Sequence, residues 1–185
     1  MEMETEETKI ETETERLLFR RFSLDDVAGF YGLNLDPLVL KFTGDKPFSS
    51  RSEVVRFIEE YDQYDKYGFG RWSLYLKSSG EYIGFCGLRQ SPETGEVDIG
   101  FRLMRRFWHR GYALESAKAS LELAFTRYGV DTVIARAMKN NLASQRLIQK
   151  LGMQLDSSFI ESGEEWLKYE LKQERWLLNN QEGEG

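Results

Sequence analysis

The stretch FWHRGYALES (residues 107–116) joins a predicted strand to a predicted helix. An apolar stripe at helical spacing begins after Gly111 and stops at Gly129. No acidic residue occurs between Asp98 and Glu115, and four arginines lie in that window: Arg102, Arg105, Arg106 and Arg110. A chain with a formal net charge of −6 therefore concentrates positive charge where a helix starts, which favours an anion at this point.

The rest of the chain alternates between strand and helix patterns. The predicted strands are residues 16–22, 71–77, 82–88, 96–103, 132–138, 153–160 and 165–171. Helices are predicted after Ser23, over residues 50–68, from Gly111 to Gly129 and over residues 142–151. This order predicts a mixed α/β domain with one sheet of about seven strands and about four helices. The unit from 96 to 138 is a strand–helix–strand crossover, so its two strands are expected to be parallel.

Acidic residues are concentrated at the two ends. Residues 1–15 carry a net charge of −6 and residues 180–185 carry −2, so subtraction from the total of −6 leaves about +2 for residues 16–179. We predict an acidic disordered tail over residues 1–13, one folded domain over residues 14–173 and a C-terminal tail over residues 174–185.

Composition argues against several classes of protein. The nearly neutral body does not favour a nucleic-acid partner. One cysteine (Cys86) and one histidine (His109) exclude an internal disulfide and make a Cys/His metal site unexpected, so we predict no metal. The chain has no run of about 18 apolar residues and no basic-then-apolar leader. We therefore expect a cytoplasmic protein with no membrane partner.

The junction at Gly111 can bind a phosphate. The first amides of a helix lack internal partners, and their dipole attracts anions. A glycine lets the anion approach the backbone, and Arg105, Arg106 and Arg110 can add charge-assisted hydrogen bonds. A solvated basic turn is the alternative interpretation, and these residues alone leave both open.

Two segments resemble motifs of the GNAT superfamily of N-acetyltransferases. FRLMRRFWHRGYALESA (residues 101–117) resembles the cofactor motif [QR]-x-x-G-x-[GA], with Arg106 first, Gly111 last and His109 in place of the middle glycine. NNLASQRLIQKLGM (residues 140–153) resembles the second cofactor motif. The residues around Gly111 are similar to the RimJ/RimL-like branch, and the similarity extends over residues 14–172.

The resemblance implies a mixed sheet splayed between its fourth and fifth strands, with acetyl-CoA bound in the cleft as co-substrate. The cofactor-binding residues that it implies are Phe101, Leu103, Arg105, Arg106, His109, Arg110, Gly111, Tyr112, Ala113, Asn141 and Ser144. Leu103 and its neighbours are expected to bond pantetheine amides through the main chain. His109 is expected to avoid a positive φ and to point its side chain outward.

The resemblance also implies direct attack of an amine on the thioester, without an acyl-enzyme. Ser144 is the candidate that helps the thiolate leave, because it corresponds to a position near the CoA sulfur. Ile148 stands where many relatives carry a tyrosine as general acid. Asp98 is the first candidate for the general base, acting through water, ahead of Glu96 and Glu115.

The resemblance implies a primary amine as the acceptor, and the residues leave a protein N-terminal α-amine, a polyamine and an aminoglycoside open. The poor set of acid–base groups favours an α-amine, whose pKa is about 7.7–8.0, over a lysine ε-amine at about 10.4. A non-catalytic acyl-CoA-binding module is the alternative, favoured by His109 and Ile148. Relatives imply a monomer or a homodimer.

Overall fold

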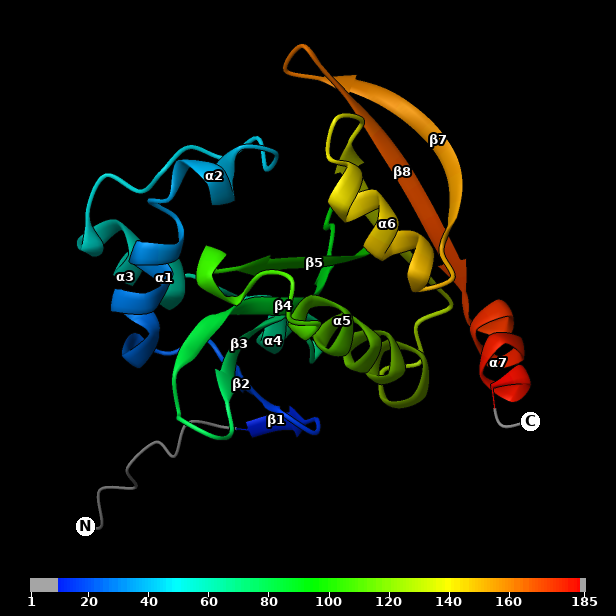
Figure 1. The fold of residues 1–185 in the computed structure, drawn as a ribbon, viewed down its shortest axis with the longest axis horizontal. Helices are drawn as coiled ribbons and strands as arrows, with labels where there is room; N and C mark the ends of the chain where they lie inside the picture. The colour runs from blue at the N-terminus through cyan, green and yellow to red at the C-terminus, as the bar shows by residue number, and fades with distance from the viewer. Residues whose placement is uncertain (1–9, 184–185) are drawn as a thin grey trace.

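The computed structural model describes residues 10–183, which form one mixed sheet with helices on both faces (Figure 1). The strands are β1 (Ile10–Glu13), β2 (Leu17–Arg21), β3 (Arg71–Leu76), β4 (Tyr82–Gln90), β5 (Val97–Leu103), β6 (Thr132–Met138), β7 (Gln154–Glu161) and β8 (Glu164–Lys172). Their order in the sheet is β1-β2-β3-β4-β5-β6-β8-β7. Neighbouring strands are antiparallel except β5 and β6, which are parallel, as the crossover predicts.

Strand β1 corrects the expected extent of the N-terminal tail. Residues 10–13, predicted as part of a disordered tail, pair with β2. The Glu11 side chain is buried, accepts a hydrogen bond from the Tyr128 hydroxyl and pairs with Arg21 at 3.4 Å. These contacts hold the strand against the body of the protein. The rest of the predicted tail, residues 1–9, lies outside the described residues.

The helices are α1 (Val27–Leu33), α2 (Pro37–Leu40), α3 (Arg51–Glu59), α4 (Gln63–Tyr67), α5 (Tyr112–Glu122), α6 (Leu142–Lys150) and α7 (Gln173–Glu182). The helix predicted over residues 50–68 is divided into α3 and α4, because side chains at the break bond to the sheet. The Tyr61 hydroxyl accepts the Arg71 N–H at 2.8 Å, and the Gln63 amide exchanges two hydrogen bonds with the Gln90 main chain. Among residues 10–183, no helix combines the length and apolar content of a membrane span.

Helix α7 lies where the sequence predicted a C-terminal tail. The Gln173 side chain donates to the Phe125 carbonyl at 2.7 Å. The Trp176 and Phe125 rings pack with their centroids 5.4 Å apart. The described part of the predicted tail is therefore folded against the segment that follows α5.

Two hydrophobic clusters pack on the two faces of the sheet. The larger one joins α5 and α6 to one face and contains Trp72 and Cys86, both fully buried. The smaller one covers the other face with α1 and α3, around Phe30. Burial raises the pKa of the Cys86 thiol, which disfavours a thiolate nucleophile at this position.

Strands β5 and β6 separate after two residue pairs, Val97–Val133 and Asp98–Ile134. Beyond them, β5 stays paired with β4, and β6 stays paired with β8. Figure 1 shows β8 running steeply across the direction of β5. The expected splay between the fourth and fifth predicted strands is confirmed. We call this divergence, between residues 99–103 and residues 135–138, the split.

Candidate functional site

Helix α5 begins after a short 3-10 turn that follows β5. Its N-cap is Gly111, with a φ of 83°, and no side chain caps it. The Glu115 N–H makes a helical bond to the Gly111 carbonyl at 3.0 Å. The preceding amides of Tyr112 and Ala113 therefore have no partner within the helix. This helix start presents uncapped N–H groups and the positive end of the helix dipole to an anion.

The main chain of β5 faces the split at alternate residues. Met104 donates its N–H to the Ile83 carbonyl of β4 at 2.9 Å. Bonded pairs recur at every second residue of an antiparallel ladder, so Phe101 and Leu103 point their N–H and C=O groups away from β4. The Trp108 indole N–H donates a hydrogen bond to the Leu103 carbonyl at 2.8 Å. Both groups of Phe101 thus remain for the expected pantetheine contacts, whereas the Leu103 carbonyl already accepts one hydrogen bond.

Acidic residues from distant parts of the sequence pair with arginines of the acid-free window. The pairs are Arg102–Asp45 at 2.7 Å, Arg105–Asp36 at 3.2 Å and Arg106–Glu81 at 3.1 Å. Arg110 has no acidic partner among residues 10–183. Arg105 and Arg106 are exposed, and exposed ion pairs contribute little free energy, so these side chains can exchange a carboxylate for a phosphate.

His109 departs from the conformation expected of it. Its φ is 59°, in the left-handed region, although its side chain is exposed as expected. The family motif has a glycine at this position, and the turn into α5 imposes the same backbone conformation on a histidine. Histidine tolerates this region better than most side chains, but not without strain.

All three carboxylates considered as a base are held in ion pairs, and those of Glu115 and Glu96 are partly exposed. Glu115 accepts hydrogen bonds from Arg16 at 3.0 Å and from the Thr14 hydroxyl at 2.9 Å. Glu96 pairs with Lys168 at 2.5 Å. Both carboxylates are therefore engaged by cations rather than held free to take up a proton.

The third candidate, Asp98, is buried at the point where β5 and β6 part. Arg71 donates to one carboxylate oxygen, and Arg89 pairs with the other at 3.1 Å. Burial alone would raise the pKa of Asp98, but the two guanidinium groups outweigh it and lower the pKa. A base must bind a proton, whereas this environment stabilises the ionised carboxylate. This environment makes Asp98 a poor proton acceptor, so we propose a structural role for it.

Ser144 lies in the first turn of α6, which follows β6 as α5 follows β5. Because these strands are parallel, both helix starts lie at the same edge of the sheet. Asn141 caps α6, its Oδ1 accepting the Ser144 N–H at 3.2 Å. Ser144 is half-buried and Ile148 is buried, as the expected face of the helix requires. The cap uses the Asn141 side chain, which was expected to bind the cofactor.

Trp166 is a residue of this sheet edge that the sequence did not single out. It pairs with Met138, the last residue of β6, and its ring stacks on Phe159 at an interplanar angle of 10°. Its Nε1 is buried without a hydrogen-bond partner among residues 10–183. A Cβ on Gly44 would lie 3.4 Å from this ring. No local sequence pattern predicts this position for Trp166, because its neighbours come from three other segments of the chain.

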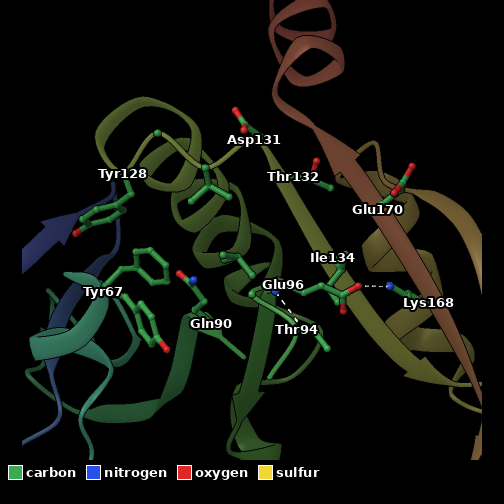
Figure 2. A pocket seen from close by; sticks show the side chains of 15 residues that line it. Tyr67, Gln90, Thr94, Glu96, Tyr128, Asp131, Thr132, Ile134, Lys168 and Glu170 are labelled. Carbon is green, nitrogen blue, oxygen red and sulfur yellow. Dashed lines mark hydrogen bonds and ion pairs between the residues drawn. The ribbon is translucent and has the colours of Figure 1, made fainter. Parts of the chain in front are cut away.

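A cavity of about 560 Å³ lies where β5 and β6 begin (Figure 2). Figure 2 shows Tyr67 and Tyr128 on one side of it and Lys168 on the other. Val97, at the start of β5, lines this cavity, whereas Leu103 lies at the other end of the strand. Six residues at about 3.3 Å each separate the two by about 20 Å. The cavity is thus distinct from the helix start at Gly111.

The sheet opens between two parallel strands, and an uncapped helix start follows the first of them, as the resemblance to N-acetyltransferases implies. The profile of the family described as acetyltransferase (GNAT) domain matches residues 16–154. The chain belongs to this acetyltransferase family.

Individual relatives agree with the family assignment. The uncharacterized N-acetyltransferase p20 of Bacillus licheniformis is 29% identical over 143 residues, covering 76% of this chain and 80% of the relative. Spermidine N-acetyltransferase from Vibrio cholerae, in complex with CoA and spermine, has a TM-score of 0.77 at 15% identity, covering 89% of this chain and 99% of that one. RimL, a ribosomal L7/L12 α-N-protein acetyltransferase in complex with coenzyme A, has a TM-score of 0.76 at 16% identity, covering 89% and 98%. At these identities the two structures are evidence for the fold alone.

Replacement of Asp98 tests its structural role. Asp98→Asn leaves the buried Arg71 without its counter-ion, so we expect a loss of about 3–5 kcal/mol in the free energy of unfolding at pH 7, measured in urea.

Because the folded-state pKa of Asp98 is lowered, this stabilisation is present at neutral pH and is lost as the pH falls through that pKa. The variant should therefore lose less stability than the wild type on acidification. Asp62→Asn, at the exposed Asp62–Lys66 pair, is the control and should change little. A folded Asp98→Asn enzyme that has lost the acidic limb of its kcat–pH profile, where the rate rises as the base loses its proton, would instead identify Asp98 as the base.

Replacement of His109 tests the strain in the turn. A non-glycine residue in the left-handed region costs about 1–2 kcal/mol. We expect His109→Gly to recover about 1 kcal/mol of this and to raise the melting temperature by about 2–4 °C. His109→Ala keeps the Cβ and should give no such gain. An unchanged or lower melting temperature for the glycine variant contradicts the assignment of strain.

Proposed function

We propose that this acetyltransferase moves the acetyl group of acetyl-CoA to a primary amine by direct attack in a ternary complex. The observation that carries the proposal is the uncapped start of α5 at Gly111, next to the end of β5. The amides of Tyr112 and Ala113 and the charge of Arg110 fit a diphosphate. The main-chain N–H and C=O of Phe101 fit the amide groups of pantetheine. The residues present thus suit the diphosphate and the pantetheine amides of coenzyme A.

Acetyl-CoA supplies a thioester whose carbonyl carbon an amine attacks. The C–N bond forms and the C–S bond breaks, and we assign to Ser144 the protonation of the departing sulfur, directly or through a water that it holds. The proton that the attacking amine loses replaces the one that Ser144 donates. Its N–H is committed to the Asn141 cap, which fixes the first turn of α6 and with it the position of the hydroxyl. The buried Cys86 takes no part in this scheme.

The acceptor that we propose is an α-amine, such as a protein N-terminus. Asp98, Glu96 and Glu115 are all paired with cations, so the site has weak proton acceptors. An α-amine is partly neutral near pH 7.5, whereas deprotonating a lysine ε-amine at that pH costs about 4 kcal/mol. The paired carboxylates also offer little to the several positive charges of a polyamine. The proposal places the enzyme in the RimJ/RimL-like branch and in the cytoplasm.

A second candidate function is a module that binds acyl-CoA without turnover. The strained His109 and the absence of a tyrosine at Ile148 favour it. Thiol release from acetyl-CoA in the presence of a mixture of amines separates the two. Amine-dependent release supports the enzyme, and tight binding without release supports the module.

Replacement of Gly111 tests the proposed phosphate site. Gly111→Glu places a side chain and a negative charge at the helix start, and we expect it to abolish coenzyme A binding in calorimetry. Gly68→Glu is the matched control, because Gly68 has a φ of 80° and an open surrounding at the end of α4. If both variants fold and Gly111→Glu binds coenzyme A normally, the phosphates bind elsewhere.

Replacement of Ser144 tests its part in the chemical step. Ser144→Ala should lower kcat about 10²-fold or more, in the range of general acid catalysis, with little change in the KM for acetyl-CoA. The exposed Ser52→Ala in α3 is the control. An unchanged kcat with a lower melting temperature would make Ser144 a packing residue.

Two peptides of identical sequence test the acceptor. One carries a free N-terminus and a methylated lysine, and the other carries a blocked N-terminus and a free lysine. We expect faster acetylation of the first near pH 7.5, because more of its acceptor amine is neutral. Faster acetylation of the second peptide, or of spermidine over both, contradicts the α-amine assignment.

A further inference from the structure

Arg16, just before β2, reaches the start of α5 from outside both cofactor motifs. Its Nε donates to Glu115 at 3.0 Å, and its Nη1 donates to the Arg110 carbonyl at 2.9 Å. Its guanidinium carbon lies 4.2 Å from the centre of the Tyr112 ring. These three contacts fix the guanidinium plane beside the helix start, while 41% of the side chain stays exposed.

The remaining nitrogen of this guanidinium faces the N-cap glycine. A Cβ built on Gly111 would lie 3.3 Å from Arg16 Nη2. Nη2 donates to no group among residues 10–183, whereas Nε and Nη1 are both engaged. An arginine carries five N–H groups in a rigid fork. The two N–H groups of Nη2 are therefore left beside the uncapped amides of α5.

The negative charge of Glu115 has to be offset by a cation before an anion can bind at the start of α5. Glu115 lies in the first turn of α5, where its charge stabilises the helix start but repels an anion bound there. Arg16 offsets that charge, and the Thr14 hydroxyl holds the second carboxylate oxygen at 2.9 Å. The first turn can then accept a phosphate without an unpaired carboxylate beside it.

We propose that Arg16 binds a phosphate group of coenzyme A through Nη2 and, through Glu115 and the Arg110 carbonyl, holds the helix start in its binding conformation. This inference rests on the proposed function and adds a residue to its phosphate site. The free N–H groups supply charge-assisted hydrogen bonds to a phosphate oxygen. Because three contacts already hold the guanidinium, little side-chain entropy is lost on binding.

Calorimetry with two ligands tests the phosphate contact: coenzyme A, and S-acetylpantetheine, which has no phosphate. We expect Arg16→Ala to weaken coenzyme A binding about tenfold or more and to leave S-acetylpantetheine binding unchanged. Arg16→Lys keeps the charge but not the fork, and should show the same selective loss, smaller in size. Arg21→Ala removes a neighbouring arginine of β2 that pairs with Glu11, and should affect neither ligand.

A double variant separates phosphate binding from charge neutralisation. If Arg16 only neutralises Glu115, adding Glu115→Gln to Arg16→Ala restores coenzyme A binding, and that result overturns the contact. An equal loss for both ligands also overturns it, whereas a persistent selective loss supports it. Wild-type protein that binds no coenzyme A overturns the proposed function itself. Wild-type binding with an unaffected Arg16→Ala overturns this inference alone.

Discussion

The separation of β5 from β6 is the constraint on which the rest of the site depends. Buried backbone N–H and C=O groups need partners, and in a continuous sheet the free edge of β5 would find them in β6. Here β6 follows β8 instead, so the main chain of β5 beyond Asp98 must be satisfied by other groups. The indole of Trp108 satisfies one, the Leu103 carbonyl. The groups that remain give the split its capacity to bind an extended chain of amides.

The position of the split is fixed by one buried cation. Asp98 is the last residue of β5 that pairs with β6, and Arg71 bonds both its carbonyl, at 3.0 Å, and its carboxylate. The same guanidinium donates to the Gly87 carbonyl of β4 at 2.9 Å. Its path requires a bare backbone, since a Cβ on Gly100 would lie 2.5 Å from Arg71 Nη2. Arg71 thus spans two strands at the residue where the third leaves them.

The sequence predicted the elements with strong periodicity and the parallel crossover over residues 96–138, because these follow from local pattern and chain connectivity. It did not predict β1, whose burial of Glu11 depends on Tyr128, more than a hundred residues away. The acidic partners of the arginine window were not predicted for a related reason: spacing shows where arginines gather, but their partners come from distant parts of the sequence. The role of Asp98 was obscure because Arg71 and Arg89 reach it only through the register of the folded sheet.

Departures from local rules gather at one edge of this sheet. His109 holds a left-handed φ, α5 starts without a side-chain cap, and the Trp166 Nε1 is buried without a partner among residues 10–183. Each departure costs free energy in the protein alone, and such costs persist at functional sites because a bound ligand offsets them. Under the proposed function, an anion would satisfy the helix start, and an extended amide chain would satisfy the free main-chain groups of β5. Main-chain groups that lack partners in the protein alone are thus the groups that would bind a ligand. Both properties follow from the divergence of β6 from β5.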